Sequence, residues 1–301
     1  MRSGFLAGFF FLVLWVPSEA WPGCSLMFDQ ALKMSGDFGR VLSKAQNGVP
    51  SAQFQVGLAY ETGNGTQQNY GEAVRWYRKA AESGDPSAQN NLGGLYSKGL
   101  GVESSDSEAM KWYLRAAVNG HLAAENNAGF MYAAGRGVAR DDVNAVGWFR
   151  KSAERGYAPA QVNLAVMYLS GRGVPADGKE AAKWYRKAAT SNSPEAELNL
   201  GLMYFHGTGV RQDLPEAIKW FRRAADQGVP AAENELAFAY ERGRGVPRDL
   251  EAALKWYRAA AEHGLPEAIQ NLSALQSRAR TQSSPDSSST LVTNVPVQGP
   301  R

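Results

Sequence analysis

Cysteine is nearly absent from this chain: its 301 residues contain one, Cys24. No intramolecular disulfide can therefore form, so the fold has to be held together by packing alone. Histidine is also scarce, and the three present share no metal-ligand spacing: His121, His206 and His263. The sequence thus gives no sign of a metal site or of a bound cofactor.

The motifs of several common hydrolases are missing as well. H-E-x-x-H, G-x-S-x-G and S-x-x-K do not occur in the chain. The 32 basic and 29 acidic residues are interspersed and leave a formal net charge of +3. No dense basic run of the kind that binds nucleic acid is present. We therefore expect a protein that is not an enzyme and does not bind nucleic acid.

Long apolar runs are confined to the N-terminus. Residues 1–20 have the three parts of a secretory signal peptide: a charged start at Arg2, a short apolar stretch over 5–16, and small residues Ser18 and Ala20 before a cleavage site. This segment predicts a mature protein that is periplasmic or secreted. The alternative, an uncleaved anchor, is disfavoured because the apolar stretch is too short for a membrane span.

Residues after the predicted signal peptide do not support membrane attachment. Cys24 stands where a lipoprotein would be acylated, but Trp21 and Pro22 do not fit the residues that normally precede such a cysteine. No apolar run beyond residue 20 is long enough to span a membrane. We therefore expect no lipid anchor at Cys24 and no membrane span after cleavage.

Tryptophan, in contrast, is present at a fixed spacing of 36 residues. The six positions are Trp76, Trp112, Trp148, Trp184, Trp220 and Trp256. A repeat period of 20–50 residues is typical of solenoids and related arrays. The solenoid is predicted over 49–280, as six full repeats and a partial seventh: 49–84, 85–120, 121–156, 157–192, 193–228, 229–264 and 265–280.

Each repeat is predicted to contain two helices joined by a turn. In 193–228, apolar residues recur at helical spacing in both halves, and Gly207 and Gly209 separate the halves. Glycine suits the left-handed residue that ends a helix, and Asp213 is a good N-cap for the second helix. One helical hairpin cannot bury both apolar stripes, so the repeats must stack. These patterns predict an all-α solenoid.

The repeat pattern resembles a known family. It reads A-x-x-x-L-x-x-x-Y-x-x-G-x-G-V-x-x-D-x-x-x-A-x-x-W-Y-x-x-A-A-x-x-G, and residues 229–264 carry it from Ala232 to Gly264. This is similar to the Sel1-like repeat, which resembles the tetratricopeptide repeat. The resemblance covers about 49–280 and implies a right-handed superhelix whose concave surface is lined by the first helices. It also implies an adaptor or scaffold that binds a protein or peptide.

The segments that flank the repeats have their own composition. Residues 21–48 end in a fading second-helix pattern and are predicted to cap the N-terminal end. The helix at 265–280 becomes basic toward its end, which suits a C-terminal cap. Residues 281–301 are rich in serine and proline, and we predict that they are disordered.

One column of asparagines is a candidate binding surface. It occupies the first-helix position before the buried leucine, at Asn91, Asn127, Asn163 and Asn199, with Asn271 in the partial repeat. An amide both donates and accepts hydrogen bonds, so this column could bind the backbone of an extended peptide. Alternatively, each asparagine bonds the backbone of a neighbouring repeat and holds the stacking.

Positions that vary between repeats are candidates for specificity. Phe54, Val162 and Leu198 precede the asparagine column, and Phe205 follows the tyrosine of the first helix. They are apolar where their counterparts are polar, so they would be partner-binding anchors if they are exposed. Arginines stand in the middle of three glycine turns: Arg136, Arg172 and Arg244. They could form a basic ridge, but we expect them to be solvated.

Three functions remain open at this stage. The first is a non-enzymatic scaffold in the cell envelope or secreted, which binds a protein or peptide along its concave face. The second is an envelope enzyme or a binder of cell-wall ligands, for which Glu61, Glu241 and His206 are the nearest titratable groups. The third is a secreted factor that binds host proteins.

Overall fold

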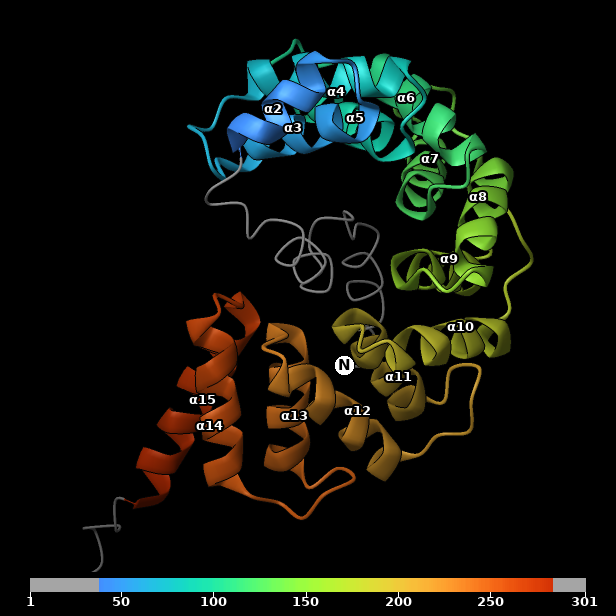
Figure 1. The fold of residues 1–301 in the computed structure, drawn as a ribbon. Helices are drawn as coiled ribbons and strands as arrows, with labels where there is room; N and C mark the ends of the chain where they lie inside the picture. The colour runs from blue at the N-terminus through green and yellow to red at the C-terminus, as the bar shows by residue number, and fades with distance from the viewer. Residues whose placement is uncertain (1–37, 284–301) are drawn as a thin grey trace, which may run out of the picture. The chain divides into compact units, whose positions relative to one another are not determined.

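The computed structural model describes residues 38–283, and within them there are fourteen helices and no strand (Figure 1). The chain divides into two compact units, Met1–Asp213 and Leu214–Arg301, which are described separately below. The predicted signal peptide, the first part of the N-terminal cap and most of the predicted tail lie outside the described residues. No helix of the described part is long and apolar enough to cross a membrane.

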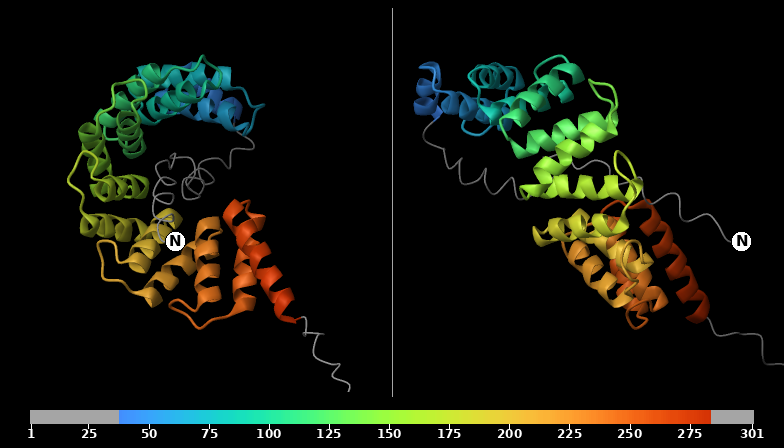
Figure 2. Two further views of the ribbon diagram at one scale, coloured as in Figure 1. Left: turned by 180° about the vertical axis from the view of Figure 1, so that it is seen from behind. Right: turned by 90° about the vertical axis from the view of Figure 1, so that its right-hand side faces the viewer.

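The first unit consists of helix pairs in chain order. Its helices are α2 (Phe38–Gln46), α3 (Pro50–Thr62), α4 (Tyr70–Glu82), α5 (Pro86–Lys98), α6 (Asp106–Val118), α7 (Leu122–Ala134), α8 (Asp142–Glu154), α9 (Ala158–Ser170), α10 (Gly178–Thr190) and α11 (Pro194–His206). Each helix packs against the next one along the chain. Figures 1 and 2 show α5, α7, α9 and α11 on the inner side of the arc that this unit forms, with α4, α6, α8 and α10 outside.

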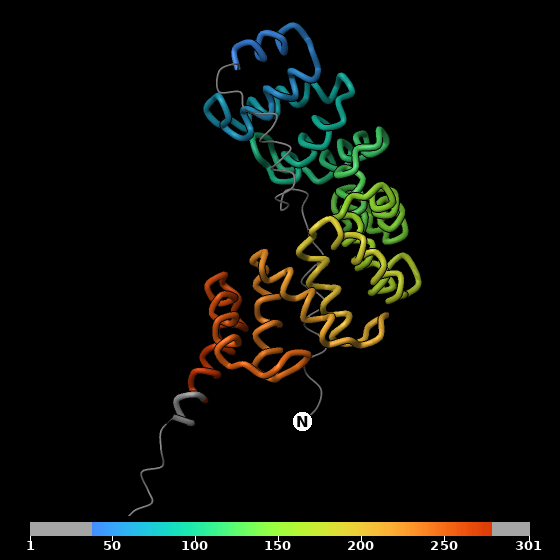
Figure 3. Tube along the Cα trace, turned by 60° about the horizontal axis from the view of Figure 1, so that its bottom comes forward, coloured from blue at the N-terminus to red at the C-terminus, as the bar shows by residue number. Residues whose placement is uncertain are grey.

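The second unit repeats the same order. It contains α12 (Leu214–Asp226), α13 (Pro230–Arg242), α14 (Leu250–Glu262) and α15 (Pro266–Ser283), which lie alongside one another (Figure 3). The last helix continues three residues past the predicted boundary at 280. Both units therefore have the predicted all-α fold of stacked helix pairs.

Local sequence explains where these helices begin and end. At α11, the Ser193 hydroxyl accepts a hydrogen bond from the amide of Ala196, and Pro194 occupies the first turn, where its missing N–H costs nothing. The helix ends at Gly207, whose φ of 73° lies in the left-handed region. Asp177 caps α10 by accepting from the amides of the first turn.

A glycine of the first helix allows the two helices of a pair to approach closely. A Cβ at Gly57 would lie 2.6 Å from Cδ1 of Tyr77, and one at Gly129 would lie 2.7 Å from Cδ1 of Phe149. The buried aromatic ring of the second helix therefore rests directly on the backbone of the first. This contact fixes how the inner and outer rows of helices are paired.

The tryptophans of the 36-residue series belong to the packing, although to different degrees. Trp76, Trp112 and Trp184 are buried, whereas the other three of the series are partly buried. A basic side chain three residues later covers the ring in most repeats: Lys187 Nζ, for example, lies 4.0 Å from the centroid of Trp184. The tryptophan ladder is thus part of the scaffold.

Candidate interaction surface

The asparagine column joins consecutive repeats through side chains. In each joined pair, the side-chain amide of a column asparagine donates to the Oδ1 of an asparagine in the preceding repeat. That second asparagine stands one residue before the column position of its own repeat. The pairs are Asn127 with Asn90 at 3.0 Å, Asn163 with Asn126 at 2.8 Å and, in the second unit, Asn271 with Asn234 at 3.0 Å. These asparagines therefore hold the stacking, but through a side-chain partner and not through the neighbour's backbone.

The remaining two members of the column lack such a partner, because the preceding repeat has an apolar residue there. Asn91 would face the position of Phe54 and instead donates to the Tyr77 hydroxyl at 3.1 Å. Asn199 would face the position of Val162 and donates to the carbonyl oxygen of Glu195 at 2.7 Å. An asparagine of the column therefore bridges two repeats only where the preceding repeat also has an asparagine just before its column position.

The four apolar candidates would be anchors only if exposed, and three of them do not meet that condition. Val162, Leu198 and Phe205 are buried, and only Phe54 is half-buried, with its ring 5.7 Å from that of Tyr77. The cause is visible at Asn90 and Asn126, which occupy the position of Val162 and Leu198 and point at the next repeat. That position lies between repeats and not on an open surface.

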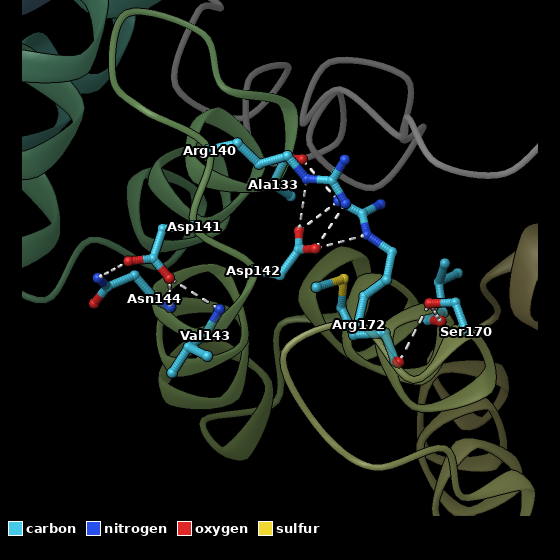
Figure 4. A network of polar contacts seen from close by, with 10 residues as sticks. Ala133, Arg140, Asp141, Asp142, Val143, Asn144, Ser170 and Arg172 are labelled. Carbon is cyan, nitrogen blue, oxygen red and sulfur yellow. Dashed lines mark hydrogen bonds and ion pairs between the residues drawn. The ribbon is translucent and has the colours of Figure 1, made fainter.

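The glycine turns bring charged residues of successive repeats together. Arg172 donates from Nε and Nη2 to the carboxylate of Asp142, at 3.2 and 2.5 Å, and from Nη2 to the carbonyl oxygen of Ala133 at 2.7 Å (Figure 4). Arg140 donates to the same carboxylate at 2.7 Å. The hydrogen bonds from Arg172 and Arg140 lower the pKa of Asp142 to about 2.

The preceding repeat has the same pair without the second arginine. Arg136 Nη2 lies 2.6 Å from Oδ1 of Asp106, and Ser104 stands at the position of Arg140. The prediction that the turn arginines are solvated is therefore wrong for Arg172, whose side chain is 22% exposed, and holds only in part for Arg136, which is paired but 36% exposed. Each is held by the aspartate that stands thirty residues before it at the start of an outer helix.

The second glycine of each turn makes this contact possible. A Cβ on Gly173 would lie 2.1 Å from the carbonyl oxygen of Asp142, and Gly137 is equally close to Asp106. Both glycines also have φ values of 68°, which side chains rarely adopt. The turn can therefore rest on the start of the outer helix in the preceding repeat.

A cavity of about 90 Å³ adjoins this network between two helices of the inner row, α7 and α9. Its walls are mostly apolar and include the outer-row residue Phe149. The lining residues are Phe130, Ala133, Ala134, Phe149, Asn163, Met167 and Arg172. Except for Asn163, none of these belongs to the predicted partner-binding set. Ala133 is a small residue at a repeat position that holds Leu169 and Phe205 in the next two repeats. This difference in size was the sequence signal for an opening there.

The titratable groups of the enzyme alternative are engaged separately. Glu61 accepts from the Tyr77 hydroxyl at 2.5 Å, and Glu241 accepts from the Tyr257 hydroxyl and from Arg278, each at 2.9 Å. The ring of His206 packs edge-on against its neighbour Phe205. Within residues 38–283, no group of three or more His, Cys, Asp or Glu side chains is placed to hold a metal ion.

Comparison with known proteins identifies the repeat. The Sel1 repeat model matches residues 50–85, 86–121, 122–157, 158–193, 194–229 and 230–265, each starting one residue after the repeats read from the tryptophans. Comparison with curated proteins gives no match.

Solved structures that are similar to the chain include the following two. One, a protective antigen present in uropathogenic Escherichia coli strains and displaying an SLR fold, is 33% identical with a TM-score of 0.75; the match covers 81% of this chain and 52% of that one. The chain thus spans about half the length of that protein. The other, a Sel1 repeat protein from Oxalobacter formigenes, is 35% identical with a TM-score of 0.71, and the match covers 78% of this chain and 68% of that one.

Proposed function

Because the chain belongs to the Sel1 repeat family, we propose that it is a non-enzymatic scaffold that binds a protein or peptide through the inner row of its first helices. Sel1 repeats commonly mediate protein interactions. A helical array of this kind offers an extended surface on which function depends on the residues that differ between repeats.

The observation that carries the proposal is the cavity between α7 and α9. Most residues that repeat in register are engaged in packing or in bonds between repeats, so they describe the scaffold. The cavity, in contrast, is lined in part by Ala133, at a position that differs between repeats, and lies between two neighbouring helices of the inner row. An apolar depression bordered by a few polar groups is the usual form of a binding site.

We place this activity in the cell envelope or outside the cell, on the basis of the predicted signal peptide at residues 1–20. The test is the N-terminal sequence of the protein recovered from cell fractions and medium. Protein that begins at Trp21 in the periplasm or medium supports the placement. Protein that keeps its N-terminal segment and stays in the cytoplasm contradicts it.

The binding role is tested by site-specific photo-crosslinking in the native host. Benzoylphenylalanine is introduced at Ala134, an exposed residue on the cavity wall, and as a matched control at Val143, which is 69% exposed on the outer helix α8. We expect discrete adducts from position 134 that are absent from position 143. Equal patterns, or adducts from position 143 alone, would overturn the proposal.

A second candidate, contact with a host, is supported by one observation. The Escherichia coli relative is described as a protective antigen of uropathogenic strains. If this chain likewise meets host proteins, the same crosslinking at Ala134, repeated in the presence of host-cell extract, should give adducts absent from bacterial fractions alone. Adducts only with bacterial envelope proteins would support the scaffold role over this candidate.

A further inference from the structure

Two guanidinium groups converge on one carboxylate beside the α7–α9 cavity. Arg140 and Arg172 both donate to Asp142 (Figure 4), so this cluster carries one positive charge in excess. The carboxylate of the adjacent residue, Asp141, is directed to the start of α8, where it accepts from the amides of Val143 and Asn144. Its hydrogen bonds therefore go to the start of the helix and not to the two arginines.

The arginine cluster and the apolar cavity have a residue in common. Arg172 is part of the cavity wall and donates to the carbonyl oxygen of Ala133, which also lines the cavity. The bonds to Asp142 and Ala133 use Nε and Nη2 of Arg172, and each guanidinium has two further N–H groups on Nη1. A ligand seated in the cavity would therefore have guanidinium donors at its edge.

We propose that the α7–α9 cavity receives an aliphatic side chain of a peptide whose neighbouring carboxylate is bound by Arg140 and Arg172. This inference rests on the proposed function and names the chemistry of the partner: an extended segment with Leu, Ile, Val or Met close to Asp or Glu. A guanidinium matches a carboxylate in geometry and charge. The volume of about 90 Å³ is smaller than the ~150 Å³ that accommodates benzene, which favours an aliphatic group over a ring.

A pair of arginines bonded to one aspartate occurs once among the corresponding turns of the first unit. In the preceding turn, Arg136 and Asp106 balance each other, because Ser104 replaces the second arginine. In the turn after α11, Thr208 replaces the arginine altogether. The acidic preference should therefore be localised to the α7–α9 cavity.

The other repeats provide substitutions that this fold already accommodates. Arg140→Ser and Arg172→Thr remove the charges by copying the residues at 104 and 208, and Ala133→Phe fills the cavity by copying the residue at 205. The control is Lys179→Ser, which removes one positive charge from the exposed first turn of α10 by copying residue 107. A cooperative thermal transition well above the assay temperature would show that each variant folds, since losing an arginine that bonds Asp142 should itself lower the midpoint.

The test uses random heptapeptides displayed on phage and selected on the full chain. We expect enrichment of an aliphatic residue within two positions of Asp or Glu. A fluorescein-labelled enriched peptide, followed by anisotropy, should bind about tenfold more weakly to Arg140→Ser or Arg172→Thr, since each loses hydrogen bonds to a charged group. Binding should be lost in Ala133→Phe and unchanged in Lys179→Ser.

Three results would overturn this inference: no enrichment, enriched peptides without an acidic residue, or undiminished binding to Ala133→Phe. In each case the crosslinking at Ala134 separates the two proposals. Adducts from position 134 would leave the scaffold function standing with a partner of different chemistry. Loss of those adducts as well would remove the proposed function itself.

Discussion

Asn163 donates a hydrogen bond to Asn126 across the boundary between two repeats, and both side chains are almost completely buried. A buried amide that loses its partner keeps the cost of desolvation without the hydrogen bond. Stacking of α9 on α7 therefore depends on a polar contact as well as on apolar burial.

Replacing one member of this pair should destabilise the first unit. We expect Asn163→Ala to lower the free energy of unfolding by about 1–3 kcal/mol, because Asn126 is left buried without its partner. The double variant Asn126→Val/Asn163→Leu replaces both partners with apolar groups and should cost less than the single change. Urea unfolding followed by circular dichroism measures these free energies. If the double variant loses at least as much unfolding free energy as Asn126→Val and Asn163→Leu lose when added together, the pair contributes nothing by itself.

Glycine at 173 is required by geometry, and this too can be measured. Gly173→Ala would place a Cβ against the carbonyl of Asp142, so we expect a loss of roughly 3 kcal/mol or more, beyond the ~1–2 kcal/mol of left-handed strain alone. The matched control is Gly156→Ala, which has φ of 90° but nothing within 4 Å of its Cβ position. Equal losses in the two variants, measured by urea unfolding, would contradict the close approach.

Asp142 should make stability depend on acid pH. Its pKa is lowered from 3.8 to about 2 by hydrogen bonds from Arg172 and Arg140, so its contribution is present above pH 4 and is lost as the pH falls toward 2. Each pKa unit corresponds to about 1.4 kcal/mol, which bounds the effect at roughly 2 kcal/mol. Unfolding free energies of the native chain and of Asp142→Asn should converge as the pH falls from 5 to 2.5; a constant difference would exclude this linkage.

Glu235 should have the opposite effect near neutral pH. In the sixth repeat, Glu235 stands at the position that asparagine holds in the column, and burial raises its pKa from 4.5 to about 7, against the opposing influence of Arg244. Because the folded state retains this proton longer than the unfolded state, stability should fall as the pH rises from 4.5 to 7. Glu235→Gln, which cannot ionise, should be more stable than the native chain at pH 8, by roughly 1–3 kcal/mol, and similar at pH 4. A pH-independent difference in thermal midpoint would contradict this.

The sequence predicted the fold closely because the repeat is dictated by local chemistry. Gly207 and the N-cap Ser193 set the ends of α11, and the aromatic at 77 fits against the glycine at 57 in the adjacent helix. Such signals recur in register, so six copies reinforce one prediction. The continuity of a single solenoid over 49–280 stays a prediction, since the two units are described separately.

The candidate surface was harder to predict, because it depends on which residues meet across repeats. Val162 looked like an exposed anchor from its apolarity, but its position faces the next repeat, as the bond between Asn126 and Asn163 shows. The partner of Arg172, Asp142, stands thirty residues away and is visible only when the turn is placed on the preceding outer helix. Predicting which side chains pair between repeats therefore requires comparing two repeat positions together.

Amide hydrogen exchange can establish whether the partner lies on the inner row at α7 and α9. The full chain is compared with and without the partner recovered by crosslinking at Ala134. Binding on the inner row should slow exchange in residues 122–134 and 158–172, with little change in the outer helix at 142–154. Slower exchange confined to the outer helices, with the inner segments unaffected, would contradict it.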